Sequence, residues 1–470
     1  MAREASGSDI SFDLAYSSIT AVVFGMVIGL LLKSTFTLTA LQFELLALAG
    51  ELVLQMFQCL AVPVLFANVL SGVVTLSSQT TGHLLSYSMV YFGVTNLLAV
   101  VTGWAFMKWI MLNDAYAEME HEAGNDDLGS FSLFGTLLEL VINILLPNSL
   151  RACIQKTQLE LIEITGDDPD DPDVDVTDHY VDGPNILGLF MWAIFLGVHL
   201  IRMGVNTGFI AQNISVVNKI TKKSSSWVRC LMPFGIMAMI ATTIVEGQDW
   251  ERFFLLGKVT VVIVAGLLFH GAVTLPLLHF VVTWQNPFSV IKGVSPALFS
   301  AFVMSSSSAT MPQTLHCCEE RLRLDRAVTR SVVPLGTSIN MNGTALYEVV
   351  AALFITQLNR LQLDASQTVT ILVTAGLSSV GASGIPATGA VTTIFVLSAV
   401  GVSTKEVAIL VAVEWILDRF NTVMNVLGDC IGVALIDALM LEDLARTGTE
   451  EQVEPRTDGA ENGEENETQV

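Results

Sequence analysis

The sequence is poor in charged residues. Asp, Glu, Lys and Arg form only 14% of its 470 residues, whereas a soluble protein usually carries about 25%. Hydrophobic residues make up 52% and the mean hydropathy is +0.60. The composition therefore excludes an ordinary soluble protein and predicts a polytopic protein of the lipid bilayer. The net charge of −23 is concentrated in residues 166–182 and in the tail from Glu442 on. It indicates solvated loops, and we expect no nucleic-acid partner.

Patterns that carry covalent catalysis or metal centres are also missing. The six cysteines have no metal-ligand spacing, and we expect free thiols. The serine run at Ser305 has no evident base in its own segment, so no enzyme is predicted. For His270 and His279 we favour packing or an interfacial position over a proton relay. The first 14 residues show no cleavable signal, and the first span would serve as an anchor.

Long apolar stretches are plentiful. A membrane-spanning helix needs about 20 mostly apolar residues. Six such spans are predicted with cores at 17–32, 44–76, 84–112, 185–200, 227–245 and 253–282. Gly25 and Gly29 give the first span a small-residue packing face, and Pro63 predicts a kink in the second.

A hydrophilic insert separates the third and fourth spans. Residues 113–130 are acidic, 133–153 form an amphipathic or re-entrant piece, and 166–183 are rich in Asp and Pro, which predicts disorder. Lys and Arg mark cytoplasmic loops. Two basic clusters, one around Lys222 and one around Arg326, therefore place both termini in the cytoplasm and the insert outside.

The pattern changes after residue 290. Residues 294–315 and 365–400 each predict two half-helices meeting at a tip of small polar residues. Each is followed by a span, at 328–358 (interrupted at 340–343) and at 408–439. Such Gly- and Pro-interrupted repeats predict a transporter site at the bilayer midplane. We therefore predict an all-α protein with eight transmembrane helices, two re-entrant hairpins and inverted repeats.

Four motifs carry a resemblance to a known family: SSSSATMP at 305–312, NMNGT at 340–344, SVGASGIPATG at 379–389 and DRFNTVMNVLGD at 418–429. They resemble the dicarboxylate/amino-acid:cation symporters, which include glutamate transporters and neutral-amino-acid exchangers. The resemblance implies sodium-coupled transport of an amino acid, a homotrimer and a chloride conductance. It also implies an elevator mechanism, in which a transport domain slides against a scaffold. The predicted divisions are tails 1–14 and 442–470, scaffold 15–78 and 184–247, insert 113–183, and transport domain 79–112 and 248–441.

The resemblance also assigns the site. Substrate would contact Ser306, Ser307, Ser308, Thr344, Ala382, Gly384, Asp418, Arg419, Asn421, Thr422 and Asn425. Sodium would contact Gly336, Ser338, Asn340, Asn342, Ser379, Val380, Ala382, Asn425, Asp429, Phe92, Thr95 and Asn96. The residues support these roles. A half-helix N-terminus favours a carboxylate, although the serines could simply cap the helix. Positions 418, 422 and 425 share one helical face, and a hard cation prefers oxygen ligands.

Three departures from the family pattern bear on the substrate and its coupling. Asn421 stands where glutamate transporters have an arginine that binds the side-chain carboxylate of the substrate. An amide cannot form the same bidentate, charge-assisted bond with a carboxylate. We therefore expect a small neutral amino acid. The alternative is an acidic amino acid held by Arg419. A further alternative is an anion channel or substrate sensor with little transport. Asn342 and Phe92 replace an aspartate and a tyrosine of the third sodium site, so we expect fewer coupled sodium ions.

Glu348 is the third departure. It occupies the position of a proton acceptor in glutamate transporters, so proton coupling is possible. The chain ends in ETQV, with Thr468 two residues before Val470, as in ligands of PDZ domains; a plain acidic tail is the alternative. We expect residence in the plasma membrane.

Overall fold

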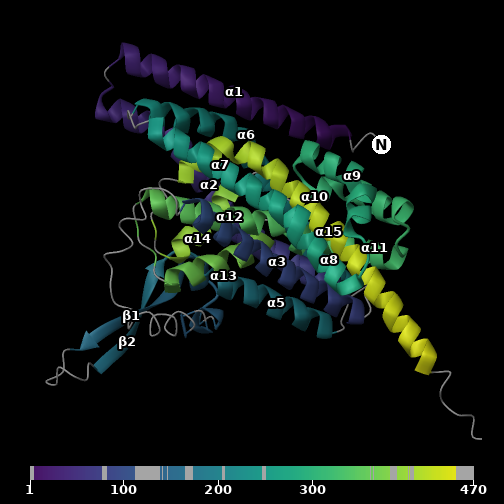
Figure 1. The fold of residues 1–470 in the computed structure, drawn as a ribbon. Helices are drawn as coiled ribbons and strands as arrows, with labels where there is room; N and C mark the ends of the chain where they lie inside the picture. The colour runs from purple at the N-terminus through teal and green to yellow at the C-terminus, as the bar shows by residue number, and fades with distance from the viewer. Residues whose placement is uncertain are drawn as a thin grey trace, which may run out of the picture.

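The computed structural model describes residues 5–36, 38–76, 82–111, 138–145 except 140, 147–164, 173–203, 207–245, 250–359, 365–381, 389–400 and 407–450, and positions 361, 363 and 402. These residues are mostly helical (Figure 1). The helices are α1 (Ala5–Thr35), α2 (Ala40–Leu76), α3 (Gly82–Met111), α5 (Ile186–Arg202), α6 (Thr207–Val245), α7 (Trp250–Phe269), α8 (Leu275–Thr283), α9 (Pro287–Met304), α10 (Ser307–His316), α11 (Arg326–Ile339), α12 (Asn342–Leu358), α13 (Ala365–Gly381), α14 (Gly389–Ala399) and α15 (Ala408–Glu450).

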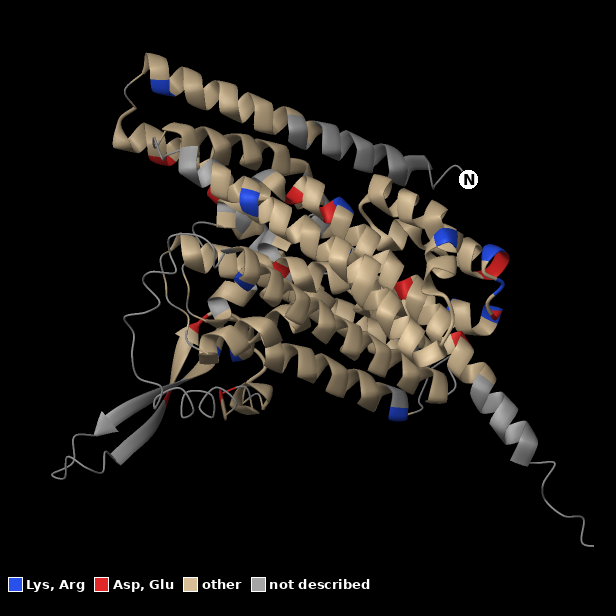
Figure 2. Cartoon of the chain, in the orientation of Figure 1, with Lys and Arg blue, Asp and Glu red and all other residues tan. Residues whose placement is uncertain are grey.

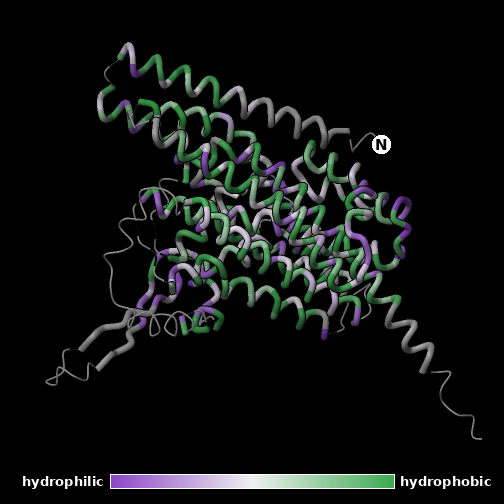
Figure 3. Tube along the Cα trace, viewed as in Figure 1, coloured by the Kyte–Doolittle hydropathy of each residue, from purple (hydrophilic) through white to green (hydrophobic). Residues whose placement is uncertain are grey.

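Apolar side chains dominate most of these helices (Figure 3), and charged residues lie mainly toward helix ends and connections (Figure 2). Among the described residues, four helical stretches are long and apolar enough to cross a bilayer: His83–Ile110, Phe254–Thr283, Pro287–Met304 and Val413–Leu441. Shorter apolar helices accompany them. These features confirm a polytopic membrane protein. The number of spans stays a prediction.

Helix α1 packs along α6, and α2 lies between α6 and α5 (Figure 1). The small-residue face predicted for α1 is confirmed. A Cβ atom added at Gly25 would lie 2.8 Å from the Met237 carbonyl oxygen, and one added at Gly29 would lie 3.0 Å from that of Ala241. Larger residues would hold the two backbones apart.

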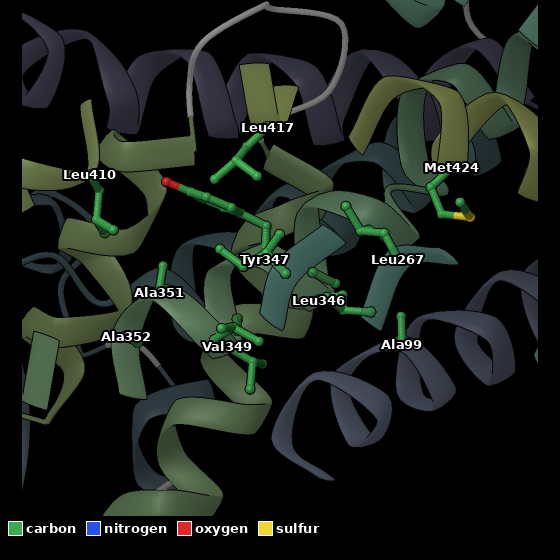
Figure 4. Packing of buried hydrophobic residues seen from close by; sticks show 14 of the residues in the cluster. Ala99, Leu267, Leu346, Tyr347, Val349, Ala351, Ala352, Leu410, Leu417 and Met424 are labelled. Carbon is green, nitrogen blue, oxygen red and sulfur yellow. The ribbon is translucent and has the colours of Figure 1, made fainter. Parts of the chain in front are cut away.

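A second group of helices surrounds α12, which contacts α3, α7, α13, α14 and α15. Its residues from Ala345 to Ile355 are almost wholly buried. Figure 4 shows Leu346 on the side of α12 toward Ala99 and Leu267, whereas the Tyr347 ring extends toward Leu417 of α15. Burial on every side of α12 makes it the centre of the molecule.

Two of the three predicted interruptions are present, and the third, at the tip of 365–400, includes residues 382–388, which lie outside the described part of the chain. Helix α9 ends at Met304, the following Ser305 has φ of 48°, and α10 begins at Ser307. Between α11 and α12 the backbone leaves helical geometry at Asn340 and Met341. Between α7 and α8, His270–Thr274 form a π-helical segment, which the sequence did not indicate.

The insert differs from its prediction. Part of the stretch expected to be disordered, residues 173–182, is strand β2 (Asp173–Asp182), which pairs in antiparallel register with β1 (Gln155–Ile164). The all-α prediction is therefore wrong in this insert. The sequence carried a signal, since Val174 and Val176 alternate with acidic residues at the period of a strand. Residues 113–130 lie outside the described part of the chain.

Two helices extend into segments that were predicted to be tails. Helix α1 starts at Ala5, inside the expected tail 1–14, and α15 continues to Glu450, inside the expected tail 442–470. Bilayer thickness limits the apolar run and not the helix. For α15, the Glu, Leu, Ala and Arg of residues 442–446 are good helix formers in water, whereas the Ser-, Gly- and Asp-rich start of α1 has no such explanation.

All six cysteines are free, as predicted. Both histidines of the sixth span are buried, with His270 0% and His279 1% exposed. Thr283 lies 3.2 Å from Nδ1 of His279. Both nitrogens of His270 and the Nε2 of His279 have no hydrogen-bond partner among the described residues, so the choice between packing and a proton relay stays a prediction.

Candidate functional site

The serine tip lies between α9 and α10. Ser306 has extended backbone angles, and its side-chain oxygen accepts a hydrogen bond from the Ala309 amide at 3.3 Å. It therefore caps α10, which is the structural alternative that the sequence left open. Ser307 is buried and Ser308 is exposed. The positive end of α10 is thus bordered by hydroxyls, an arrangement suited to an anion.

Arg419 of α15 points to the same tip. Its Nη1 donates to the carbonyl oxygens of Phe302 and Val303, both at 2.9 Å. These are among the last carbonyls of α9, where the helix dipole favours a cation. The guanidinium thereby joins α15 to the end of the first half-helix. The bonds to α9 use Nη1 alone, so the other donors of the guanidinium are the ones with which an acidic substrate could pair.

One face of α15 carries the predicted substrate residues. Asp418 is half-buried, and its carbonyl accepts from the Thr422 hydroxyl at 2.7 Å. Asn425 is held by α12, because its Oδ1 accepts from the Gly343 amide at 2.8 Å and its Nδ2 donates to Thr344 at 3.4 Å. The structure thus brings the Asn340–Thr344 motif and the α15 motif together.

Asn421 lies at the same break. It is 4% exposed, and its Oδ1 has no hydrogen-bond partner in the described part of the chain. A Cβ added at Gly343 would lie 2.9 Å from the Asn421 Cα. The two backbones therefore touch, and Asn421 presents an unsatisfied acceptor inside the protein.

A buried polar chain runs from α3 to α15. The Thr95 hydroxyl donates to Asn340 Oδ1 at 3.3 Å, and Asn340 Nδ2 donates to Asp429 Oδ1 at 3.0 Å. Asp429 is 1% exposed. A side chain at Gly336 would collide with this carboxylate. A buried carboxylate with neutral oxygens around it suits a small hard cation.

Asn342 and Asn96 contrast with that chain. Asn342 is 0% exposed, and neither atom of its amide has a partner among the described residues. Asn96 Nδ2 donates to the Gly376 carbonyl at 2.9 Å, whereas its Oδ1 is likewise without a described partner. Phe92 is buried next to Tyr91, whose hydroxyl donates to the Gly428 carbonyl at 2.8 Å.

Glu348 is wholly buried, about two turns along α12 from the break. The Ser378 hydroxyl of α13 donates to it. Neither Ser378 nor Tyr91 was among the predicted site residues. Ser378 directly precedes the predicted Ser379, and Tyr91 precedes Phe92, so adjacency to a predicted residue was the available signal.

The remaining predicted residues are only partly described. Ser379 and Val380 are buried at the end of α13, and Ser338 is half-buried on α11. Ala382, Gly384, Thr468 and Val470 lie outside the described residues. The described part of the chain has no cluster of three or more His, Cys, Asp and Glu side chains able to hold a metal. Its oxygen-rich break fits an alkali cation carried as cargo better than a resident transition metal.

The chain is similar in sequence to known transport proteins over nearly its whole length. The family model described as the sodium:dicarboxylate symporter family matches residues 14–439. Excitatory amino acid transporter 3 of Oryctolagus cuniculus is 35% identical over 463 residues, which cover 94% of this chain and 88% of the relative. Excitatory amino acid transporter 2 of Homo sapiens is 33% identical, with coverage of 93% and 80%. A Caenorhabditis elegans excitatory amino acid transporter is 34% identical, with coverage of 89% and 86%.

Proposed function

The chain belongs to the sodium:dicarboxylate symporter family, and from this premise we propose that it is a membrane transporter that couples amino-acid movement to sodium. The observation that carries the proposal is the break between α11 and α12. There Asn340 donates to Asp429, and Asn425 accepts from the Gly343 amide, so side chains of α15 bond to both edges of the break. Polar groups at this depth are costly unless they serve a site.

The relatives favour an acidic substrate over the neutral one that Asn421 predicts, because those compared are named excitatory amino acid transporters. In the proposed complex, the substrate α-carboxylate meets the N-terminus of α10 and the ammonium meets Asp418. The side-chain carboxylate then pairs with Arg419.

A small neutral amino acid is the second candidate. It rests on the buried Oδ1 of Asn421, which has no described partner. A substrate hydroxyl or amide could donate to this oxygen, whereas a carboxylate would be repelled by it. The two candidates therefore place the substrate side chain against different residues of α15.

Sodium would bind at Asp429 and Asn340, with a further site at Ser338, Ser379 and Val380. We propose fewer coupled sodium ions than in relatives with a carboxylate at position 342, because Asn342 supplies no charge. Glu348 would take up a proton. An elevator motion, a homotrimer, cytoplasmic termini and a plasma-membrane location complete the proposal, with chloride conductance and a PDZ partner as lesser parts of it.

The test is sodium-driven uptake by the purified full-length protein in liposomes. Labelled L-aspartate, L-glutamate, L-alanine, L-serine, L-glutamine and L-asparagine are compared. We expect accumulation of L-aspartate or L-glutamate that Arg419→Gln reduces at least about tenfold. Accumulation of a neutral substrate, shifted toward L-aspartate by Asn421→Arg, would establish the second candidate. Ligand-gated current without accumulation would replace both with a channel.

A further inference from the structure

The one buried lysine in the described insert reaches outside it. Lys156, the second residue of β1, is 7% exposed, and its ammonium donates to the backbone carbonyl of Ala399. Ala399 is the last residue of α14, 243 positions away in the sequence. Figure 1 shows the start of β1 close to α13 and α14. A buried lysine is uncommon unless it is paired, so this contact needs an explanation.

The chemistry of the contact is favourable. The C-terminus of a helix carries partial negative charge and attracts a cation. The turn after α14 is closed by Val400 and Val402, whose amides both bond to the Leu397 carbonyl, while the Ala399 carbonyl accepts from the lysine. Burial lowers the pKa of Lys156, and the nearby charge of Glu139 partly opposes this shift. The ammonium therefore depends on its partners for stabilisation.

The base of the insert is firmly joined to α5. Asn143 bonds twice with the backbone of Thr157, donating at 2.7 Å and accepting at 3.1 Å. Asn185 donates to the Asn143 carbonyl at 2.9 Å and caps α5 by accepting from the Gly188 amide at 2.9 Å. Asn143, Thr157 and Asn185 are all buried. Lys156 thus projects from a platform whose position follows that of α5.

We infer that Lys156 is a positioning residue of the transport cycle, which holds the end of α14 against the insert in the described arrangement. The inference rests on the proposed function, in which α5 belongs to the scaffold and α14 to the moving domain. Motion between them must break the bond between Lys156 and Ala399. In the proposed cycle, substrate binds the arrangement in which this bond is made. Loss of the bond lowers the population of that arrangement and the apparent affinity with it.

The test compares Lys156→Met, Lys156→Gln and Lys156→Arg in the full-length protein. Arg151→Met is the matched control, because Arg151 is a cation of the same insert that stacks on Tyr180 within it. Hydrogen–deuterium exchange of residues 389–400 reports the contact. Sodium-driven uptake of L-aspartate gives KM and the maximal rate.

We expect Lys156→Met to increase exchange in residues 389–400 and to raise KM about three- to tenfold, with the maximal rate changed less than about twofold. A charge-assisted bond accounts for a factor of this order. Lys156→Gln should be intermediate, Lys156→Arg close to the wild type, and Arg151→Met unchanged.

Wild-type exchange and KM in both Lys156→Met and Lys156→Gln would overturn the inference. An equal loss in Lys156→Arg would show that the site needs the shape of lysine and not a cation, and would also overturn it. Should the wild type fail to transport L-aspartate, the proposed substrate fails. The exchange measurement still decides whether Lys156 holds α14, because it requires no transport.

Discussion

Two polar clusters meet at the break between α11 and α12, and they are built differently. In the first, Asn340 links Thr95 to the carboxylate of Asp429 by hydrogen bonds. In the second, Asn342 is equally buried, yet its amide has no partner among the described residues. The first cluster has a formal charge, and its side chains are joined by hydrogen bonds. The second has no charge and leaves polar atoms unsatisfied, which costs free energy. Two residues apart on one chain, these asparagines are expected to bind sodium with very different strength.

Removal of the charge from the first cluster should have the largest effect. Asp429→Asn leaves sodium with neutral ligands only, and we expect its half-saturation concentration for uptake to rise about a hundredfold. Sodium titration of uptake measures this. Asp437→Asn is the control, since Asp437 lies two turns further along α15 and accepts from the Asp325 amide. An unchanged sodium requirement in Asp429→Asn would show that the clusters do not differ as described.

Addition of a charge to the second cluster should make the two alike. Asn342→Asp supplies a carboxylate among buried oxygens, and we expect sodium affinity to rise about tenfold, with one more sodium ion moved per substrate. Reversal potentials at varied sodium give this count. Asn359→Asp, at the end of α12, should leave it unchanged. The expectation is wrong if the wild type already couples as many ions as Asn342→Asp.

Glu348 of α12 differs from Asp429 in its hydrogen-bond partner. Asp429 accepts from the amide of Asn340, whereas the buried Glu348 accepts from the hydroxyl of Ser378. If it carries a proton in the cycle, uptake should change a few-fold between mildly acidic and mildly alkaline pH. Glu348→Gln, which mimics the protonated form, should flatten this dependence. Thr356→Ala is the control, because this buried hydroxyl of the same helix donates to the Leu353 carbonyl at 2.7 Å. A wild-type profile that is flat and equal to that of Glu348→Gln would contradict proton coupling.

The smallest effect is expected where a carboxylate of the same type pairs with an arginine whose side chain is 64% exposed. Glu319 accepts from Arg330 at 2.7 and 3.1 Å at the exposed end of α11, and this bond lowers the pKa of Glu319. Its stabilisation is present at neutral pH and is lost as pH falls through the lowered pKa. Glu319→Gln should lower Tm by less than about 2 °C at neutral pH and low salt, and by nothing in acid. A larger loss would mean that this pair stabilises more than a surface ion pair normally does.

Much of the fold could be predicted from local sequence. Apolar runs predicted the helices. The polar stretches at Ser305 and Asn340 predicted interruptions, because polar residues at membrane depth indicate backbone that is buried in protein or lines a cavity. The limits of helices were less predictable, since α1 and α15 extend into polar sequence. The strand β2 was missed because its acidic composition outweighed its alternating pattern. The π-helical segment at His270 had no local signal.

The site was predictable in its residues and not in its contacts. Motifs placed Asn425 and Asp429 in the site, but which atoms they touch depends on how α12 and α15 pack. Arg419 illustrates the limit, because its bonds to the carbonyls of α9 follow from tertiary structure. The neutral substrate predicted from Asn421 rested on one side chain. The relatives, which share much of the chain, favour an acidic substrate instead.

The bond from the Tyr91 hydroxyl to the Gly428 carbonyl joins residues 337 positions apart. A ribosome adding about 5–20 residues per second needs roughly 20–70 s to make the intervening chain. During that time α3 resides in the membrane without its eventual partner, and the break at Asn340 likewise lacks Asp429. The nascent protein must therefore carry unsatisfied polar groups in lipid or in the insertion machinery until its final helix is released. Biosynthesis, as well as transport, thus depends on α15, and a chain truncated before it would expose these groups to cellular quality control.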